Sequence, residues 1–334
     1  MMKQAWVFLL VIFPICIASC GPALLTPSPV PSPSPLPSLL PTCLPAPGDF
    51  YSNNEGTNKQ ATLLADTIYG GLFIGALGRN DTVGMNHARS QASQFFTYEV
   101  KRWTSASQEI SFSDGSKARI FVTFISPQLI RAAALAHAML GDIEGHNLNA
   151  YTARGLKRLD RRNEYLFLVT VQSEAAANSQ EQIAFSTDLF ALKGTSGLPI
   201  RHIRHDHFLD TPILLSQGHL AGFIYFPLTQ QINETCSSVL DEERDSYLIL
   251  TMSHVKIGNQ HQTLTFEIPF ISPALFDNET IPTPLPNLNL TAEEFTPSNQ
   301  LAPLATFSTN PEEFWKQFTR FVWKKLTFDG LVSE

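Results

Sequence analysis

The densest group of ionisable residues in the chain is the run Arg201-His202-Ile203-Arg204-His205-Asp206-His207. On a β-strand, alternate side chains share a face, so His205 and His207 would point to the same side. A third imidazole, His219, follows after a turn and could face them across a hairpin. Three neutral imidazoles are a catalytic set of zinc ligands. One hypothesis is therefore a metal-dependent enzyme that uses His205, His207 and His219.

The charges of the same run favour a different interpretation. Arg201 and Arg204 would repel a divalent cation, and they could instead pair with Asp206 or Asp210. The chain also lacks the nucleophile elbow, the phosphate-binding loop, the HExxH zinc motif and the CxxC pair that mark common classes of enzyme. We therefore expect a solvated polar segment, no cofactor and a non-catalytic protein.

The N-terminus carries a short apolar run, Trp6 to Ile17, which is preceded by Lys3. The run falls short of the roughly 20 apolar residues that a membrane-spanning helix requires, and it is typical of a signal peptide. It ends in Ile17-Ala18-Ser19-Cys20, which resembles the lipobox of bacterial lipoproteins. That resemblance implies cleavage before Cys20, acylation of Cys20 by groups such as palmitate, and an extracytoplasmic protein held at the cell membrane or cell surface.

Two cysteines remain once Cys16 leaves with the signal peptide and Cys20 carries the lipid. Cys43 and Cys236 would then lie in an oxidising compartment, where they either form a disulfide or stay free. We leave both alternatives open.

A proline-rich segment follows the predicted lipid anchor, with 10 prolines between Pro22 and Pro47. Such a segment adopts an extended polyproline conformation at about 3.1 Å per residue, which would hold a domain up to roughly 80 Å from the lipid. We therefore predict a signal peptide over residues 1–19 and a lipidated tether over residues 20–48.

Residues 49–163 are predicted to form an α/β region. Apolar spacing indicates helix between Gln60 and Trp103, and Glu109 to Ile125 is typical of a hairpin with a Ser-Asp-Gly-Ser turn. Ser126-Pro127 then begins a helix that ends at Gly141.

Residues 164–272 are rich in strand-forming patterns. Tyr165 to Val171 is apolar at almost every position, as in a strand buried on both faces, and Thr263 to Phe270 alternates between apolar and polar residues. Seven or so short strands favour an antiparallel sandwich. The stretches Phe185 to Leu192 and Gly218 to Phe226 resemble immunoglobulin-like β-sandwich domains. This resemblance implies a fold and hardly implies a function.

Residues 273–334 are predicted to form a polar loop and a C-terminal amphipathic helix. Asn310-Pro311-Glu312-Glu313 has the spacing of a capping box, and aromatic residues from Phe314 to Phe321 follow on one side. This side could dock on the sandwich and close the fold, or it could lie on an anionic membrane. Docking is the alternative that we favour.

The bulk composition limits the function. The chain is 43% hydrophobic and 16% charged with a net charge of −7, so it can build a core, and it offers no basic face for nucleic acid. We expect a mainly β protein with helical additions, in which an α/β region precedes an immunoglobulin-like sandwich and a C-terminal helix closes it. Its expected role is that of a non-catalytic binding or accessory module of the envelope, whose protein or ligand partner is unknown.

Overall fold

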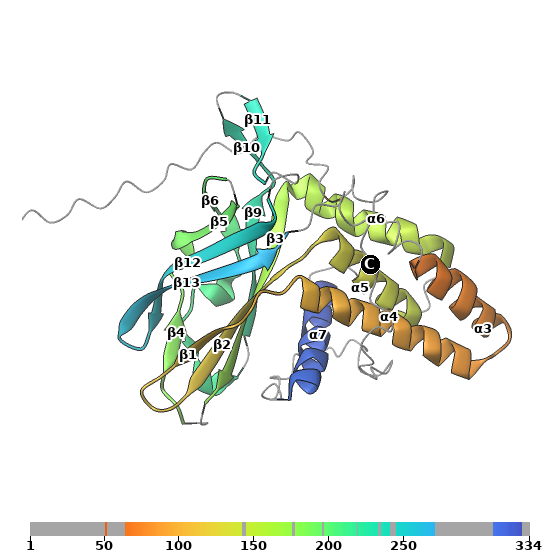
Figure 1. Ribbon diagram of the computed structural model, residues 1–334, viewed down its shortest axis with the longest axis horizontal. Helices are drawn as coiled ribbons and strands as arrows, with labels where there is room; N and C mark the ends of the chain where they lie inside the picture. Colours follow the sequence, from red (N-terminus) through yellow and green to blue (C-terminus); the bar gives the residue numbers. More distant parts are fainter. Residues whose placement is uncertain are drawn as a thin grey trace, which may run out of the picture. The chain divides into compact units, whose positions relative to one another are not determined.

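The computed structural model of the protein describes residues 51, 64–141, 145–175, 178–195, 197–218, 220–232, 235–240, 245–270 and 310–328. They form antiparallel β-sheets with a group of helices beside them (Figure 1). The fold is therefore mixed, and it holds more helix than the mainly β protein that we predicted. An immunoglobulin-like sandwich is not confirmed. The predicted lipidation site Cys20 and its tether lie outside the described residues.

The first sheet contains the predicted hairpin. Its strands, in spatial order, are β1 (Gln108–Ser111), β2 (Lys117–Phe124), β3 (Glu164–Glu174), β9 (Leu220–Pro227) and β7 (Arg204–His205). The turn between β1 and β2 has a φ of 84° at Gly115, where glycine avoids the steric penalty of a side chain. β3 is buried along almost its whole length, which confirms that both of its faces are covered.

The second sheet is built around β12. Its strands, in spatial order, are β6 (Ile200–Arg201), β5 (Phe190–Gly194), β12 (Tyr247–Ile257), β4 (Gln182–Ala184) and β8 (Ile213–Leu214), with β13 (Gln260–Pro269) along the other edge of β12. In β13, Leu264, Phe266 and Ile268 are buried while their neighbours are exposed, which confirms the predicted alternation. The predicted strand from Ile183 to Leu192 is interrupted by the 3-10 helix η2 (Thr187–Leu189).

The two sheets share one hydrophobic core. The Phe124 ring of β2 lies 6.1 Å from that of Phe270, which directly follows β13, and Gln108 Nε2 donates to the Thr265 carbonyl at 3.0 Å. β1 and β2 come from the predicted α/β region, yet β2 pairs with β3 in the same sheet, and both strands contribute to the same core. The predicted division at Glu164 therefore marks a change from helix to strand within one folding unit. A separate hairpin, β10 (Thr229–Ile232) with β11 (Thr235–Ser238), was not predicted.

The helices gather at one end of the sheets (Figure 1). They are the π-helix η1 (Asp66–Phe73), α3 (Ile74–Gly78), α4 (Thr82–Arg102), α5 (Pro127–Gly141) and α6 (Gly145–Arg162). Asp81 caps α4 by accepting from Gly84 N, and Ser126 caps α5 by accepting from Leu129 N, as its sequence predicts. The charged helix α6 was not predicted from the sequence. It buries Leu156 and Leu159. Within the described residues, no helix combines the length and the apolar character needed to cross a membrane.

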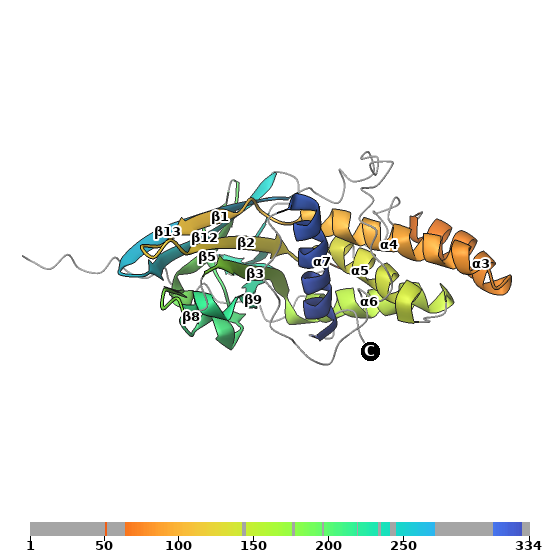
Figure 2. The same cartoon turned by 90° about the horizontal axis from the view of Figure 1, so that it is seen from below.

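The C-terminal helix α7 (Pro311–Phe328) packs between the sheets and the other helices (Figure 2). Its capping residue Asn310 accepts from Glu313 N at 3.5 Å. Phe314 and Phe318 lie 5.2 Å and 5.6 Å from Phe121 of β2, measured between ring centroids. The aromatic side of α7 is buried inside the protein, which confirms docking and leaves that side unavailable to a membrane.

Candidate functional site: a histidine–aspartate network where the two sheets meet

The chain passes from one sheet to the other within the histidine-rich run. β6 pairs with β5 in the second sheet, and β7 pairs with β9 in the first sheet, so only His202 and Ile203 connect them. Ile203 N donates to Tyr225 O at 2.8 Å, which fixes the bend. The single strand that we predicted from Ile200 to His207 is therefore wrong, because the run divides between two sheets.

His202 occupies the interior side of this bend. Its ring centroid lies 6.0 Å from Phe190 of the second sheet and 6.3 Å from Phe226 of the first. The pKa of His202 is lowered to about 4, mainly by burial between these rings and to a smaller extent by the neighbouring His205. His202 is therefore neutral at pH 7.

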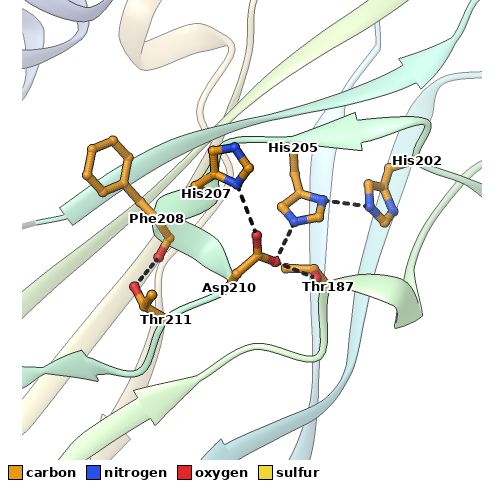
Figure 3. A network of polar contacts seen from close by, with 7 residues as sticks. All are labelled: Thr187, His202, His205, His207, Phe208, Asp210 and Thr211. Carbon is orange, nitrogen blue, oxygen red and sulfur yellow. Dashed lines mark hydrogen bonds and ion pairs between the residues drawn. The ribbon is translucent and has the colours of Figure 1, made fainter.

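A chain of polar contacts leads from His202 toward the surface (Figure 3). His202 Nε2 lies 2.9 Å from His205 Nδ1, and His205 Nε2 lies 2.6 Å from Asp210 Oδ1. Asp210 Oδ1 also accepts from Thr187 Oγ1 at 3.1 Å, and its Oδ2 lies 3.6 Å from Nδ1 of the fully exposed His207. We call these five residues the histidine–aspartate network.

The contacts restrict where the protons lie. The hydrogen bond from His205 holds the pKa of Asp210 below its usual value, with smaller contributions from Thr187 and His207, so the carboxylate is ionised and accepts. His205 Nε2 must then carry a hydrogen. With its hydrogen on Nε2, the His205 ring can accept through Nδ1 from His202 Nε2–H. The network is therefore a continuous chain of hydrogen bonds from His202 to Asp210.

Arg204, one of the two arginines in this run, has a partner that we did not predict. Arg204 binds Glu164 with two hydrogen bonds of 2.7 Å and 2.6 Å, and its guanidinium lies 3.4 Å from the centroid of the Tyr225 ring. The Glu164 bond is the main cause that raises the pKa of Arg204. Asp206 instead accepts from Phe223 N at 2.9 Å. The predicted pairing of Arg204 with Asp206 or Asp210 is therefore wrong.

The structure describes two of the three predicted metal ligands. His205 and His207 both contact Asp210, whereas His219 lies outside the described residues. In the part of the chain that the structure describes, no group of three or more His, Cys, Asp and Glu side chains is placed to hold a metal ion. The Cys43 and Cys236 side chains also fall outside what is described, so the three-histidine site and the disulfide both remain predictions.

A surface hollow of about 370 Å³ lies elsewhere, over β4 and the β12–β13 turn. Its lining includes Gln182, Glu181, Lys256 and Asn259, and it shares no residue with the histidine–aspartate network. Glu181 already accepts from Ser113 Oγ at 2.8 Å. Because ligand pockets are mostly apolar with a few converging polar groups, this polar hollow is a weaker candidate for a binding site.

The sequence analysis singled out the histidines, but it did not predict that Thr187 and Asp210 belong to the same network. Thr187 belongs to a segment that we predicted as strand, and Asp210 was expected to pair with an arginine. The bond between Thr187 and Asp210 spans 23 positions of sequence, so no local pattern signals it.

Comparison of the chain with models of protein families, with curated proteins and with solved structures finds no match.

The stability of the protein is expected to fall by about 1–2 kcal/mol between pH 6.5 and pH 4 through His202 alone, after allowance for partial solvent screening. The pKa of His202 is about 4 in the folded state and near 6.5 in the unfolded chain, so in this window the unfolded chain binds a proton that the folded protein does not. The stabilisation is complete above pH 6.5 and is lost as the pH falls. Urea unfolding across this range measures it.

His202→Phe tests the assignment, because phenylalanine fits beside Phe190 and Phe226 and cannot titrate. The matched control is His87→Gln, which changes an exposed histidine of α4. We expect a flatter pH dependence for His202→Phe and no change for the control. An unchanged slope in His202→Phe would show that another group is responsible.

Proposed function

We propose that this chain is a lipid-anchored extracytoplasmic protein that serves as a non-catalytic binding or accessory module of the cell envelope. The anchor would be Cys20, and the tether would let the folded part lie at any distance from the bilayer up to the tether's own length. The likeness of residues 164–272 to immunoglobulin-like sandwiches belongs to the same proposal as a statement of fold, and it carries no argument for the function.

The single structural observation that supports binding is a group of exposed apolar side chains. Leu72, Ile74, Leu77 and Val83 are 40%, 40%, 49% and 81% exposed and lie on the consecutive helices η1, α3 and α4. They make up half of the exposed large apolar side chains in the described part of the chain. A group of exposed apolar side chains is the kind of surface through which proteins contact other proteins or membranes.

The histidine–aspartate network favours the same proposal over a metal-dependent enzyme. A histidine binds a metal through a ring nitrogen with a free lone pair. Both ring nitrogens of His205 already have partners, since one contacts His202 and the other contacts Asp210. A metal ion would have to displace at least one of them.

We expect the full chain, expressed in a bacterium that acylates lipoproteins, to incorporate labelled palmitate and to fractionate with membranes. Cys20→Ser should abolish both, because its hydroxyl does not replace the thiol that takes the lipid. Cys16→Ser is the control, since Cys16 leaves with the signal peptide. Unchanged labelling in Cys20→Ser would contradict the anchor.

Elemental analysis of the same purified protein tests the proposal that the protein is not a metal-dependent enzyme. We expect no zinc above background in the unaltered chain or in His205→Ala. One equivalent of zinc that is lost in His205→Ala would overturn this part of the proposal in favour of the metal-dependent enzyme.

A further inference from the structure

The exposed apolar residues lie on a helical hairpin formed by η1, α3 and α4. Figure 1 shows that α3 and the beginning of α4 form the end of the helical group that is farthest from the sheets. Leu72, Ile74, Leu77 and Val83 will be called the apolar hairpin tip. Arg89 of α4 holds the base of the hairpin, because its Nε donates to Met139 O of α5 at 3.0 Å and its guanidinium lies over Phe73.

One segment of this hairpin, made of the end of η1 and all of α3, lacks polar side chains. From Gly70 to Gly78 every residue is glycine or apolar, and six of these nine residues are exposed. A helix on the surface of a soluble protein normally turns charged and polar residues toward water. Here water faces leucine, isoleucine and glycine, so this segment is suited to an apolar environment.

The charge around the tip differs from that of the whole protein. Between Asp66, which begins η1, and Tyr98 the chain has two arginines, Arg79 and Arg89, and two carboxylates, Asp66 and Asp81, so this stretch is neutral although the chain has a net charge of −7. The Asp81 carboxylate is engaged in capping α4. Arg79 is exposed in the turn that joins α3 to α4. An apolar tip flanked by an arginine matches an anionic lipid surface, where apolar side chains enter the acyl region and cations stay among the headgroups.

We propose that the apolar hairpin tip inserts into the lipid surface of the membrane that anchors the chain. This inference rests on the proposed function, because the lipid on Cys20 would keep the tip within a tether's length of that surface. Such confinement raises the effective concentration of the membrane at the tip, so a small apolar contact is enough.

The size of the tip favours a membrane over a second copy of the chain. Its four side chains leave roughly 300–400 Å² exposed, whereas a stable protein interface buries about 800 Å² on each partner. A membrane needs no complementary pocket, and the tether supplies the proximity that a free partner would lack.

Brominated lipids, which quench only tryptophans that touch acyl chains, provide the test. The acylated full chain is placed in vesicles of phosphatidylglycerol and phosphatidylcholine with brominated acyl chains. Val83→Trp adds a tryptophan at the tip, and Leu198→Trp adds one at a site that is 77% exposed but remote from the hairpin in sequence. We expect loss of the added emission in Val83→Trp alone, and its recovery when Leu77→Asp is introduced into the same chain.

Equal quenching in the two tryptophan variants, or quenching that survives Leu77→Asp, would overturn insertion. A dimer of the Cys20→Ser chain in sedimentation, lost in Leu77→Asp, would instead assign the tip to a second copy. Cosedimentation of the Leu198→Trp chain with the vesicles reports the anchor independently. A failed anchor and a failed tip therefore give different results.

Discussion

Gly194→Ala is expected to destabilise the protein by about 3 kcal/mol, which is the upper end of the range for overpacking a buried site. Gly194 is the last residue of β5, is buried and pairs with Leu248 of β12. A β-carbon at Gly194 would fall inside the van der Waals radii of the Asp245 carboxylate. Asp245 is only 4% exposed, so neither the strand nor the carboxylate can move away freely.

The chain supplies a close control in Gly197→Ala. A β-carbon there would meet no atom nearer than 3.7 Å, which is ordinary van der Waals contact. Neither glycine has the positive φ that would itself penalise alanine, so the comparison isolates the steric clash. We expect Gly197→Ala to lie within about 0.5 kcal/mol of the unaltered protein. Guanidinium unfolding at pH 7, followed by circular dichroism, measures both variants.

A double-mutant cycle identifies the cause. If the clash with Asp245 produces the loss, Gly194→Ala should cost much less when Asp245→Ala is already present. The same cost in both backgrounds would show that the carboxylate is not responsible.

Trp323→Ala should lower the free energy of unfolding by about 4 kcal/mol, in the range found for removing a large aromatic side chain from a core. Trp323 is 1% exposed and lies between two helices of the helical group. Its ring centroid is 5.7 Å from Phe96 of α4 and 5.5 Å from His137 of α5. Because α7 also contacts Phe121 of the first sheet, this substitution should loosen the attachment of the helices to the sheets.

Trp315→Ala is the matched control on the same helix. Trp315 is only partly buried, although its ring contacts Phe314 and Lys101 lies over it at 5.8 Å. We expect a loss of about 1 kcal/mol for this variant. Circular dichroism is the appropriate probe, since both variants alter the fluorescence. Similar losses for the two tryptophans would refute the central position of Trp323.

Local patterns in the sequence predicted several elements well. The Ser-Asp-Gly-Ser turn predicted the β1–β2 hairpin, Ser126-Pro127 predicted the beginning of α5, and Asn310 predicted the beginning of α7. The alternation from Thr263 to Phe270 predicted which side of β13 is buried. Each of these features depends on hydrogen bonds or side-chain directions within a few residues of chain. Such interactions form in much the same way whatever the rest of the protein does.

The candidate site depends on contacts that no such pattern contains. The histidine-rich run was noticed from its composition, but its division between two sheets follows from the pairing of β6 with β5 and of β7 with β9. Arg204 forms its hydrogen bonds with Glu164, which is 40 positions away in the sequence, and not with the neighbouring aspartates. The apolar residues of the hairpin formed by η1, α3 and α4 can be read from the sequence. Their exposure depends on which other helices cover them.

By itself, the sequence determined the local elements and the lipobox-like segment that predicts the anchor at Cys20, because these depend on neighbouring residues. Only the tertiary structure decided that His202 is a neutral residue between two sheets, that Gly194 must lack a side chain, and that α7 faces the protein interior. It also decided that the hairpin tip faces solvent. The physical reason is the same in each case: burial, close packing and desolvation arise where segments distant in sequence meet.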